Sequence, residues 1–188
     1  GGTTPNNNFA TNSSNTFAFS YYDGSKAAGS KYIYPYNTTN TGGFGTSDGD
    51  SSNHTEHGRG YSLKTAIGQK NITWRAKFPV ENVAINISDV GDKYNLLGNP
   101  YPAYLQVNSN ANATNNILDI NTGVLEEETI WLWDAATGSF TPKNQISAAF
   151  RINPMQGFFI KAKSGGGSTQ SFSFTEAMQS HNKTNNFF

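Results

Sequence analysis

Residues 157–162 read Gly-Phe-Phe-Ile-Lys-Ala, and their side chains alternate as those of a half-buried β-strand do. Residues two apart on a strand share a face, so Phe158 and Ile160 lie on one face while Phe159 and Lys161 lie on the other. A glycine opens the run and a Gly-rich segment follows it, which is typical of a strand bounded by turns. We therefore expect a strand whose Phe158 side faces a core.

Similar short runs of β-branched and aromatic residues, bounded by Gly, Asn, Asp and Pro, recur along the whole chain. A long stretch of helical period is absent, so we expect very little helix, and residues 117–127 are the candidate stretch for it. We predict an all-β fold, a β-sandwich or jelly roll made of two pseudo-repeated halves packed together. The predicted strands lie near residues 16–22, 31–36, 60–66, 71–78, 82–88, 93–98, 129–134, 157–163 and 170–175.

An internal repeat supports the division into halves. Residues 60–65 read Gly-Tyr-Ser-Leu-Lys-Thr and match residues 157–162, and two flanking segments match in the same order. Three matched segments in one order predict a duplication. The flanking pairs are 19–23 with 130–134, and 70–78 with 170–174. The predicted organisation is a linker at 1–15, a first β half at 16–90, a second β half at 91–178 and a tail or linker at 179–188.

Aligning the halves singles out one strand face of the second half. Trp131, Trp133, Phe159 and Lys161 occupy positions that are partly polar in the first half. Flat aromatic rings suit the apolar C–H faces of sugars, and a lysine can hold an acidic or sulfated group. We interpret this face as a polysaccharide-binding platform. The alternative is that the rings pack against the other half, where burial stabilises by roughly 25 cal/mol per Å².

A second candidate surface lies at the turn Asn99-Pro100-Tyr101-Pro102. Each proline fixes φ near −65° and biases its predecessor to extended geometry, so the turn is expected to end a strand and stiffen the chain. Tyr101 and Tyr104 are candidates to line this corner as a further stacking surface for the ligand. The alternative is a purely structural corner.

The amino-acid composition excludes several classes of binding partner. The chain has 188 residues, with 13 Lys+Arg balanced by 13 Asp+Glu. A formal net charge of zero removes the long-range field that draws proteins to phosphate backbones, so we expect no nucleic acid partner. Cysteine is absent, which excludes disulfides and thiolate metal sites. No apolar run approaches the ~18 residues of a membrane span, so no membrane insertion is expected.

Two loop motifs contain residue types that bind metals. Residues 48–53 read Asp-Gly-Asp-Ser-Ser-Asn and offer oxygens that Ca²⁺ uses, but they lack the length and the terminal acid of an EF-hand loop. His54 and His57 flank Glu56 in a Gly-rich loop, three residues apart, so the helical zinc-protease spacing is missing. We interpret both as polar surface loops and expect no cofactor, with a structural Ca²⁺ ion as the alternative.

The blocks Asn-Pro-Tyr-Pro at 99–102 and Gln-Gly-Phe-Phe-Ile-Lys-Ala at 156–162 carry a resemblance. With residues 94–103 and 130–134 they resemble a β-rich module that recurs in large secreted and cell-surface proteins of the Bacteroidota, many of them exported by type IX secretion. The resemblance covers roughly residues 58–188. It implies a secreted or cell-surface location and an all-β fold, and it supplies no catalytic residues.

The sequence predicts a non-catalytic module. Glycoside hydrolysis needs two carboxylates about 5 to 9.5 Å apart, and no pair stands out; a Gly-x-Ser-x-Gly motif is also missing. We expect a carbohydrate-binding or adhesion module of a secreted multidomain protein, whose partners are a polysaccharide and other domains of the same polypeptide. The alternatives are a structural spacer without a ligand and, behind it, a fragment of a polysaccharide hydrolase or lyase.

Overall fold

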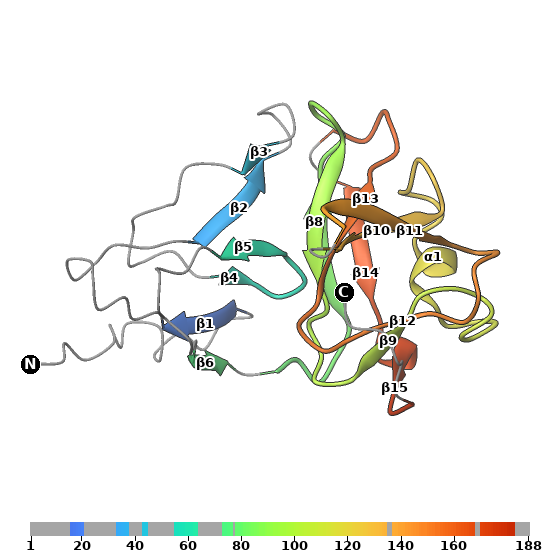
Figure 1. The fold of residues 1–188 in the computed structure, drawn as a ribbon, viewed down its shortest axis with the longest axis horizontal. Coiled ribbons are helices and arrows are strands. Elements are labelled where there is room, and N and C mark those ends of the chain that lie inside the picture. The colour runs from blue at the N-terminus through green and yellow to red at the C-terminus, as the bar shows by residue number, and fades with distance from the viewer. Residues whose placement is uncertain are drawn as a thin grey trace, which may run out of the picture.

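The computed structural model describes residues 16–20, 33–37, 43–44, 55–63, 73–76, 78–134, 137–167 and 170–182. Side chains are described for residues 57–60, 78–134, 137–167 and 170–182. Strands dominate these residues, in antiparallel sheets, and Figure 1 shows β7 to β15 gathered around one centre. The prediction of an all-β fold is confirmed.

A four-stranded antiparallel sheet with the order β11-β10-β13-β8 carries the candidate site. The strands are β8 (Tyr94–Gly98), β10 (Thr129–Asp134), β11 (Ser139–Asn144) and β13 (Gly157–Lys161). In the register, Trp131 lies opposite Pro142 on β11 and opposite Phe159 on β13, and Phe159 lies opposite Leu96 on β8. Outward residues of neighbouring strands therefore stand in rows across the sheet.

The other strands of this region form two small groups. β7 (Val83–Ile87) pairs with β14 (Gln170–Phe174), and β9 (Tyr104–Gln106) pairs with β12 (Arg151–Ile152) and with β15 (Gln179–Ser180). Within the described ranges, helix is limited to α1 (Ile117–Ile120) and a 3-10 turn (Glu176–Met178). Asn116 caps α1, because its side chain accepts a hydrogen bond from the Asp119 N–H at 2.9 Å.

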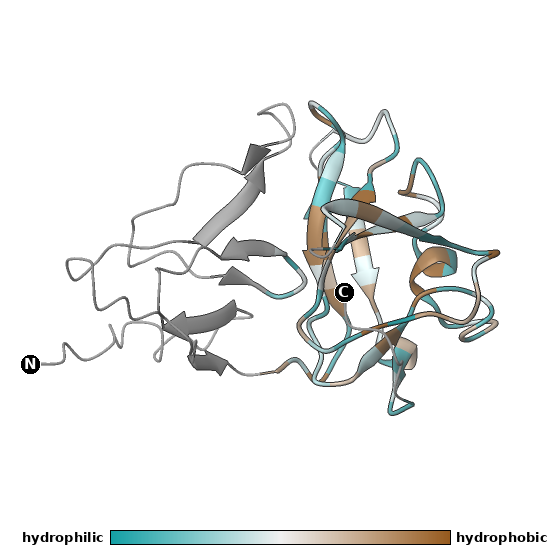
Figure 2. Ribbon diagram, in the orientation of Figure 1, coloured by the Kyte–Doolittle hydropathy of each residue, from teal (hydrophilic) through white to brown (hydrophobic). Residues whose placement is uncertain are grey.

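One apolar core joins these groups. Phe158 of β13 and Phe174 of β14 meet edge to face with ring centroids 6.3 Å apart. Figure 2 shows apolar segments on the strands and on α1, and polar segments mainly in the connecting loops. The largest fully buried side chains are Ile87, Leu97, Tyr101, Leu105, Ile117, Leu118, Ile130, Leu132, Ile152, Phe158, Phe172 and Phe174.

Buried asparagines hold the connecting loops onto this core. The Asn108 side chain is fully buried, donates to the carbonyl oxygens of Asn144 and Ser147 at 3.1 and 2.8 Å, and accepts from the Phe150 N–H at 3.3 Å. Asn121 donates to the Ser173 carbonyl at 3.0 Å and accepts from its N–H at 2.7 Å. These amides satisfy backbone groups that a strand ladder would otherwise pair.

The N-terminal strands are described by their backbone. β1 (Thr16–Ser20) pairs with β4 (Thr55–Glu56) and β6 (Thr73–Ala76). β2 (Ile33–Asn37) pairs with β3 (Gly43–Phe44) and β5 (Tyr61–Leu63).

The segment just before β5 lies against the edge of β8. The Gly60 N–H donates to the Leu96 carbonyl and the Gly98 N–H donates to the Gly58 carbonyl, each at 2.9 Å. A Cβ on Gly60 would lie 2.7 Å from the Leu97 carbonyl oxygen, so this close approach requires glycine.

Each of the nine predicted strands coincides with an observed one, and the strand ends differ by a few residues. The prediction places β7 in the first half, yet β7 pairs along its length with β14, because Ile85 and Ile87 belong to the common core. The predicted tail contains β15, yet this strand pairs with β9.

The pairings do not follow the predicted repeat either. β1 and β6 are neighbours, whereas their predicted counterparts β10 and β14 lie in different sheets. The duplication and the sandwich packing of two halves stay predictions.

Candidate functional site

The candidate site is the outward face of the sheet β11-β10-β13-β8. Ile130 and Leu132 of β10 point into the core and are fully buried, so the alternate residues Trp131 and Trp133 point outward. The same alternation turns Phe158 and Ile160 of β13 inward. The facing predicted for the four residues Trp131, Trp133, Phe159 and Lys161 is confirmed, and the structure places all four on one face.

Five aromatic rings on this face lie in two groups, and each ring contacts a neighbour within its group. Tyr94 meets Trp131 with ring centroids 5.5 Å apart, Phe140 meets Phe159 at 5.3 Å, and Trp133 meets Phe140 at 5.1 Å. The interplanar angles are 82°, 86° and 67°, so neighbouring rings meet edge to face. Such pairs contribute about 0.5–1.5 kcal/mol beyond their buried area and hold each other in place. We call this set the aromatic face.

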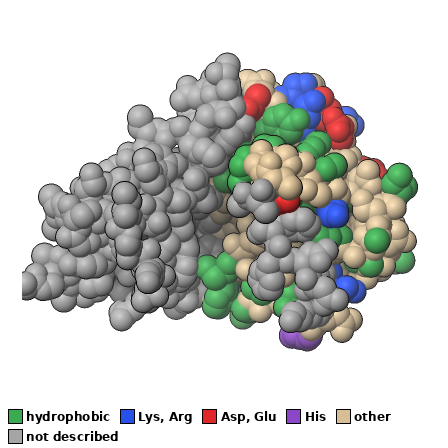
Figure 3. All heavy atoms as spheres, in the orientation of Figure 1, with side chains coloured by type: hydrophobic (Ala, Val, Ile, Leu, Met, Phe, Trp, Pro, Cys, Tyr) green, Lys and Arg blue, Asp and Glu red, His purple; other side chains and the backbone are tan. Residues whose placement is uncertain are grey.

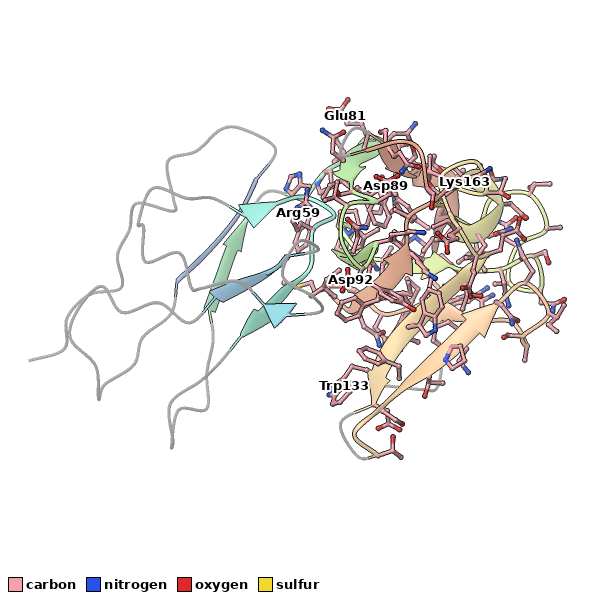
Figure 4. All side chains as sticks on the ribbon, turned by 90° about the horizontal axis from the view of Figure 1, so that it is seen from above. Arg59, Glu81, Asp89, Asp92, Trp133 and Lys163 are labelled. Carbon is pink, nitrogen blue, oxygen red and sulfur yellow. The ribbon has the colours of Figure 1, made fainter. Side chains whose placement is uncertain are left out.

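Exposure rises along the aromatic face toward one end of β10. Trp131, Phe159 and Tyr94 are half-buried, whereas Trp133 is 51% and Phe140 48% exposed. Figure 4 shows Trp133 projecting from the margin of the described ribbon, away from the labelled Glu81, Asp89 and Lys163. The Trp133–Phe140 pair is thus the accessible end of this face.

Charged side chains occupy the opposite end. The Lys161 Nζ lies 3.0 Å from Glu126 Oε1 and 3.7 Å from Glu127 Oε1, and the Lys93 Nζ lies 2.7 Å from Glu126 Oε2. The Lys161 Nζ also lies 5.9 Å from the centre of the Tyr94 ring. Basic and acidic side chains lie next to one another near the upper end of β8 in Figure 3.

The backbone brings these charges together. The Glu126 N–H donates to the Lys161 carbonyl and the Ala162 N–H donates to the Lys93 carbonyl, each at 2.9 Å. Hydrogen bonds from Lys93 and Lys161 lower the pKa of Glu126 from 4.5 to about 2. The hydrogen bond to Glu126 raises the pKa of Lys161 above its ordinary value. Both residues are therefore charged over the whole neutral range.

Tyr101 is not part of the aromatic face, and its prediction as a stacking residue is wrong. Its side chain is fully buried, and its hydroxyl donates to the carbonyl oxygens of Glu81 and Phe174 at 3.0 and 3.1 Å. Burial raises its pKa to about 12. Asn99 fixes the corner, since its Oδ1 accepts from the Tyr101 N–H at 2.9 Å and its Nδ2 donates to the Ala103 carbonyl at 2.8 Å. The turn is a structural corner.

Tyr104 lies apart from the other candidates as well. It begins β9, opposite Ser180 of β15, in a different sheet from the aromatic face, and it is half-buried. Tyr104 is therefore not a cross-strand neighbour of Trp131 or Trp133.

Sequence reasoning missed two members of the aromatic face. Tyr94 lies within a predicted strand, two residues before Leu96, and its alternation with the buried Asn95 and Leu97 is a signal that could have placed it outward. Phe140 lies on β11, which the sequence did not predict, because Pro142 interrupts the strand pattern and most of β11 is exposed or half-buried.

The predicted loop sites fall mostly outside the described residues. Residues 48–53 and His54 are not described, and His57 is buried at 7% exposure. Within the described part of the chain, no group of three His, Cys, Asp or Glu residues could hold a metal ion. No helix of the described ranges is long and apolar enough to cross a membrane.

Comparison with known proteins gave no match among family models, curated proteins or solved structures.

Proposed function

We propose that this chain is a non-catalytic carbohydrate-binding or adhesion module of a secreted multidomain protein, and that the aromatic face binds a polysaccharide. The observation that carries the proposal is the gathering of five rings on one outward sheet face, each in contact with a neighbouring ring, with Trp133 and Phe140 half exposed. Exposed apolar surface of this kind marks an interaction site more often than an isolated exposed side chain does.

The geometry supports binding in two ways. Each ring is braced by a neighbour, so little side-chain freedom remains to be lost when a ligand docks. The Trp133 indole also carries an N–H donor beside its apolar ring, which matches a sugar that presents C–H groups and hydroxyls together. The secreted location rests on the resemblance to modules of Bacteroidota surface proteins.

Affinity gel electrophoresis tests the proposal. We expect a polysaccharide in the gel to retard the wild-type chain, and we expect Trp133→Ala and Phe140→Ala to weaken this retardation. Phe78→Ala is the matched control, because Phe78 is 43% exposed and lies outside the four strands of the sheet. Absence of retardation by every polysaccharide of a panel containing neutral, uronic and sulfated members would overturn the proposal.

The edge-to-face geometry supports a second candidate, a structural spacer whose aromatic face packs against another domain of the same polypeptide. Rings that meet at 67° to 86° form no single flat platform. Acrylamide quenching of tryptophan fluorescence in the full-length parent protein separates the two candidates. Strong quenching favours a ligand surface, and weak quenching that becomes strong in the isolated chain favours the spacer.

A further inference from the structure

We propose that the ligand of the aromatic face is an uncharged polysaccharide. Acidic and sulfated chains are excluded because neighbouring glutamates balance the positive charge of Lys161. This inference rests on the proposed function, since it names the class of ligand for the same surface. It reverses the role that the sequence suggested for Lys161, which was to hold an acidic or sulfated group.

Charge is scarce on the aromatic face. Among the outward positions of β8, β10, β11 and β13, Lys161 is the one charged side chain. Lys143 belongs to the opposite set, because it lies across from the inward Ile130, and its Nζ is 5.1 Å from the centre of the Phe150 ring. Recognition of an anionic polymer by this face would therefore depend on Lys161.

The protein's own carboxylates already satisfy Lys161. Glu126 and Glu127 lie 3.0 and 3.7 Å from its Nζ, and Glu126 is shared with Lys93. Two lysines and two glutamates sum to a net charge of zero, so the cluster offers no attraction to a distant anion. A sulfate or carboxylate that reached Lys161 would also come close to two fixed negative charges.

An uncharged chain meets no such obstacle. Its C–H faces can lie on Trp133 and Phe140, while its hydroxyls can accept from the Trp133 N–H and donate to the Glu127 carboxylate, whose side chain is 52% exposed. Both kinds of contact are insensitive to the net charge of the cluster. The arrangement thus favours neutral polymers for two reasons. Their sugar rings can stack on the exposed aromatic side chains, and the balanced charges offer anionic polymers no attraction.

Affinity gel electrophoresis with four polymers tests the inference: mixed-linkage β-glucan and galactomannan as neutral probes, polygalacturonate as the uronic probe and carrageenan as the sulfated probe. We expect retardation by at least one neutral probe and by neither anionic probe. Lys161→Met should change the affinity for the neutral probe by less than about fivefold, since exposed ion pairs contribute little.

A charge-releasing variant gives the sharper result. Glu126→Gln combined with Glu127→Gln leaves Lys93 and Lys161 without their carboxylates, and we expect this variant to acquire retardation by carrageenan that weakens at high salt. A cooperative thermal transition with a midpoint close to that of the wild type shows that the variant is folded. If it acquires no affinity for carrageenan, exclusion by neutralisation is wrong.

The remaining outcomes separate this inference from the proposed function. Retardation of the wild type by the anionic probes alone, lost in Lys161→Met, overturns the inference and leaves carbohydrate binding standing. Absence of retardation by all four probes overturns both.

Discussion

The two faces of the β11-β10-β13-β8 sheet are built from the same strands but differ in burial and in the contacts that their side chains make. Phe158 and Ile160 are at most 1% exposed, whereas their neighbours Phe159 and Lys161 are half-buried on the other side. The inner positions of β10 and β13 that pack into the common core are apolar, while the inner side of the edge strand β11 includes Lys143. The outer face has five aromatic rings but is only partly buried and is held by ring contacts and ion pairs, so hydrophobicity alone does not separate a core from a surface.

The largest expected effect on stability comes from replacing one of two neighbouring phenylalanines of β13 by alanine. Phe158→Ala removes a fully buried ring that contacts Phe174, so we expect the free energy of unfolding to fall by about 3–5 kcal/mol. Phe159→Ala is the matched variant and should cost about 1–2 kcal/mol, since this ring is only half-buried and less apolar surface is lost from the folded state. Urea unfolding of both measures the difference. Equal losses would show that the outer face is as much a core as the inner one.

The next effect concerns the buried hydroxyl of Tyr101. Its pKa is raised to about 12 from 10, so the folded state retains the proton where the unfolded state loses it. The stability linked to this group is complete below pH 10 and falls as the pH rises toward 12, by up to about 3 kcal/mol. Tyr101→Phe should be less stable near neutral pH but should show a flatter decline between pH 10 and 12 in chemical denaturation. Parallel declines in the two proteins would contradict the assignment.

Trp133→Ala should separate binding from stability. About half of this side chain is exposed, so we expect the free energy of unfolding to change by less than about 1 kcal/mol. The affinity for a retarding polysaccharide should fall by about tenfold or more, because aromatic anchors dominate binding surfaces. The two measurements are a urea titration and affinity electrophoresis. A large loss of stability with unchanged retardation would make Trp133 a structural residue.

The smallest effect lies in the ion pairs at the other end of the aromatic face. The pKa of Glu126 is lowered to about 2, so its stabilising contribution is complete above about pH 4.5 and disappears as the pH falls through 2. Thermal midpoints of the wild type and Glu126→Gln should therefore converge as the pH is lowered from 5 to 2. The difference at neutral pH should be small, because these charges are at the surface. A constant difference across this range would rule out the ion pair as its source.

Local alternation makes most of the strands predictable. Residues 129–134 and 157–161 each show a strict two-residue pattern, and this pattern is sufficient to place Trp131, Trp133, Phe159 and Lys161 on one face. β11 is not predicted because Pro142 stands in its middle, and β12 because it is two residues long. Short edge strands are set by their partners rather than by their own sequence.

The parts that depend on distant contacts are not predictable in this way. Tyr101 and Trp133 are both aromatic residues near strand ends, and only the carbonyls of Glu81 and Phe174 show that the first belongs inside. The ion pairs of Lys161 also need the fold, because Glu126 is 35 positions away in the chain (161 − 126) and reaches it through the pairing of their backbones. Sequence spacing contains no signal for either arrangement.

The glycine segment beside β8 has a consequence for shortened versions of the protein. Gly58 and Gly60 satisfy the Gly98 N–H and the Leu96 carbonyl on the outer edge of β8, and at the far edge of the same sheet Pro142 of β11 has no N–H to offer. A chain cut to begin at residue 78 would retain the apolar core but leave the β8 edge open to strands from other molecules. We expect residues 57–60 to protect this edge against self-assembly, so a fragment made for crystallisation or binding work should retain them.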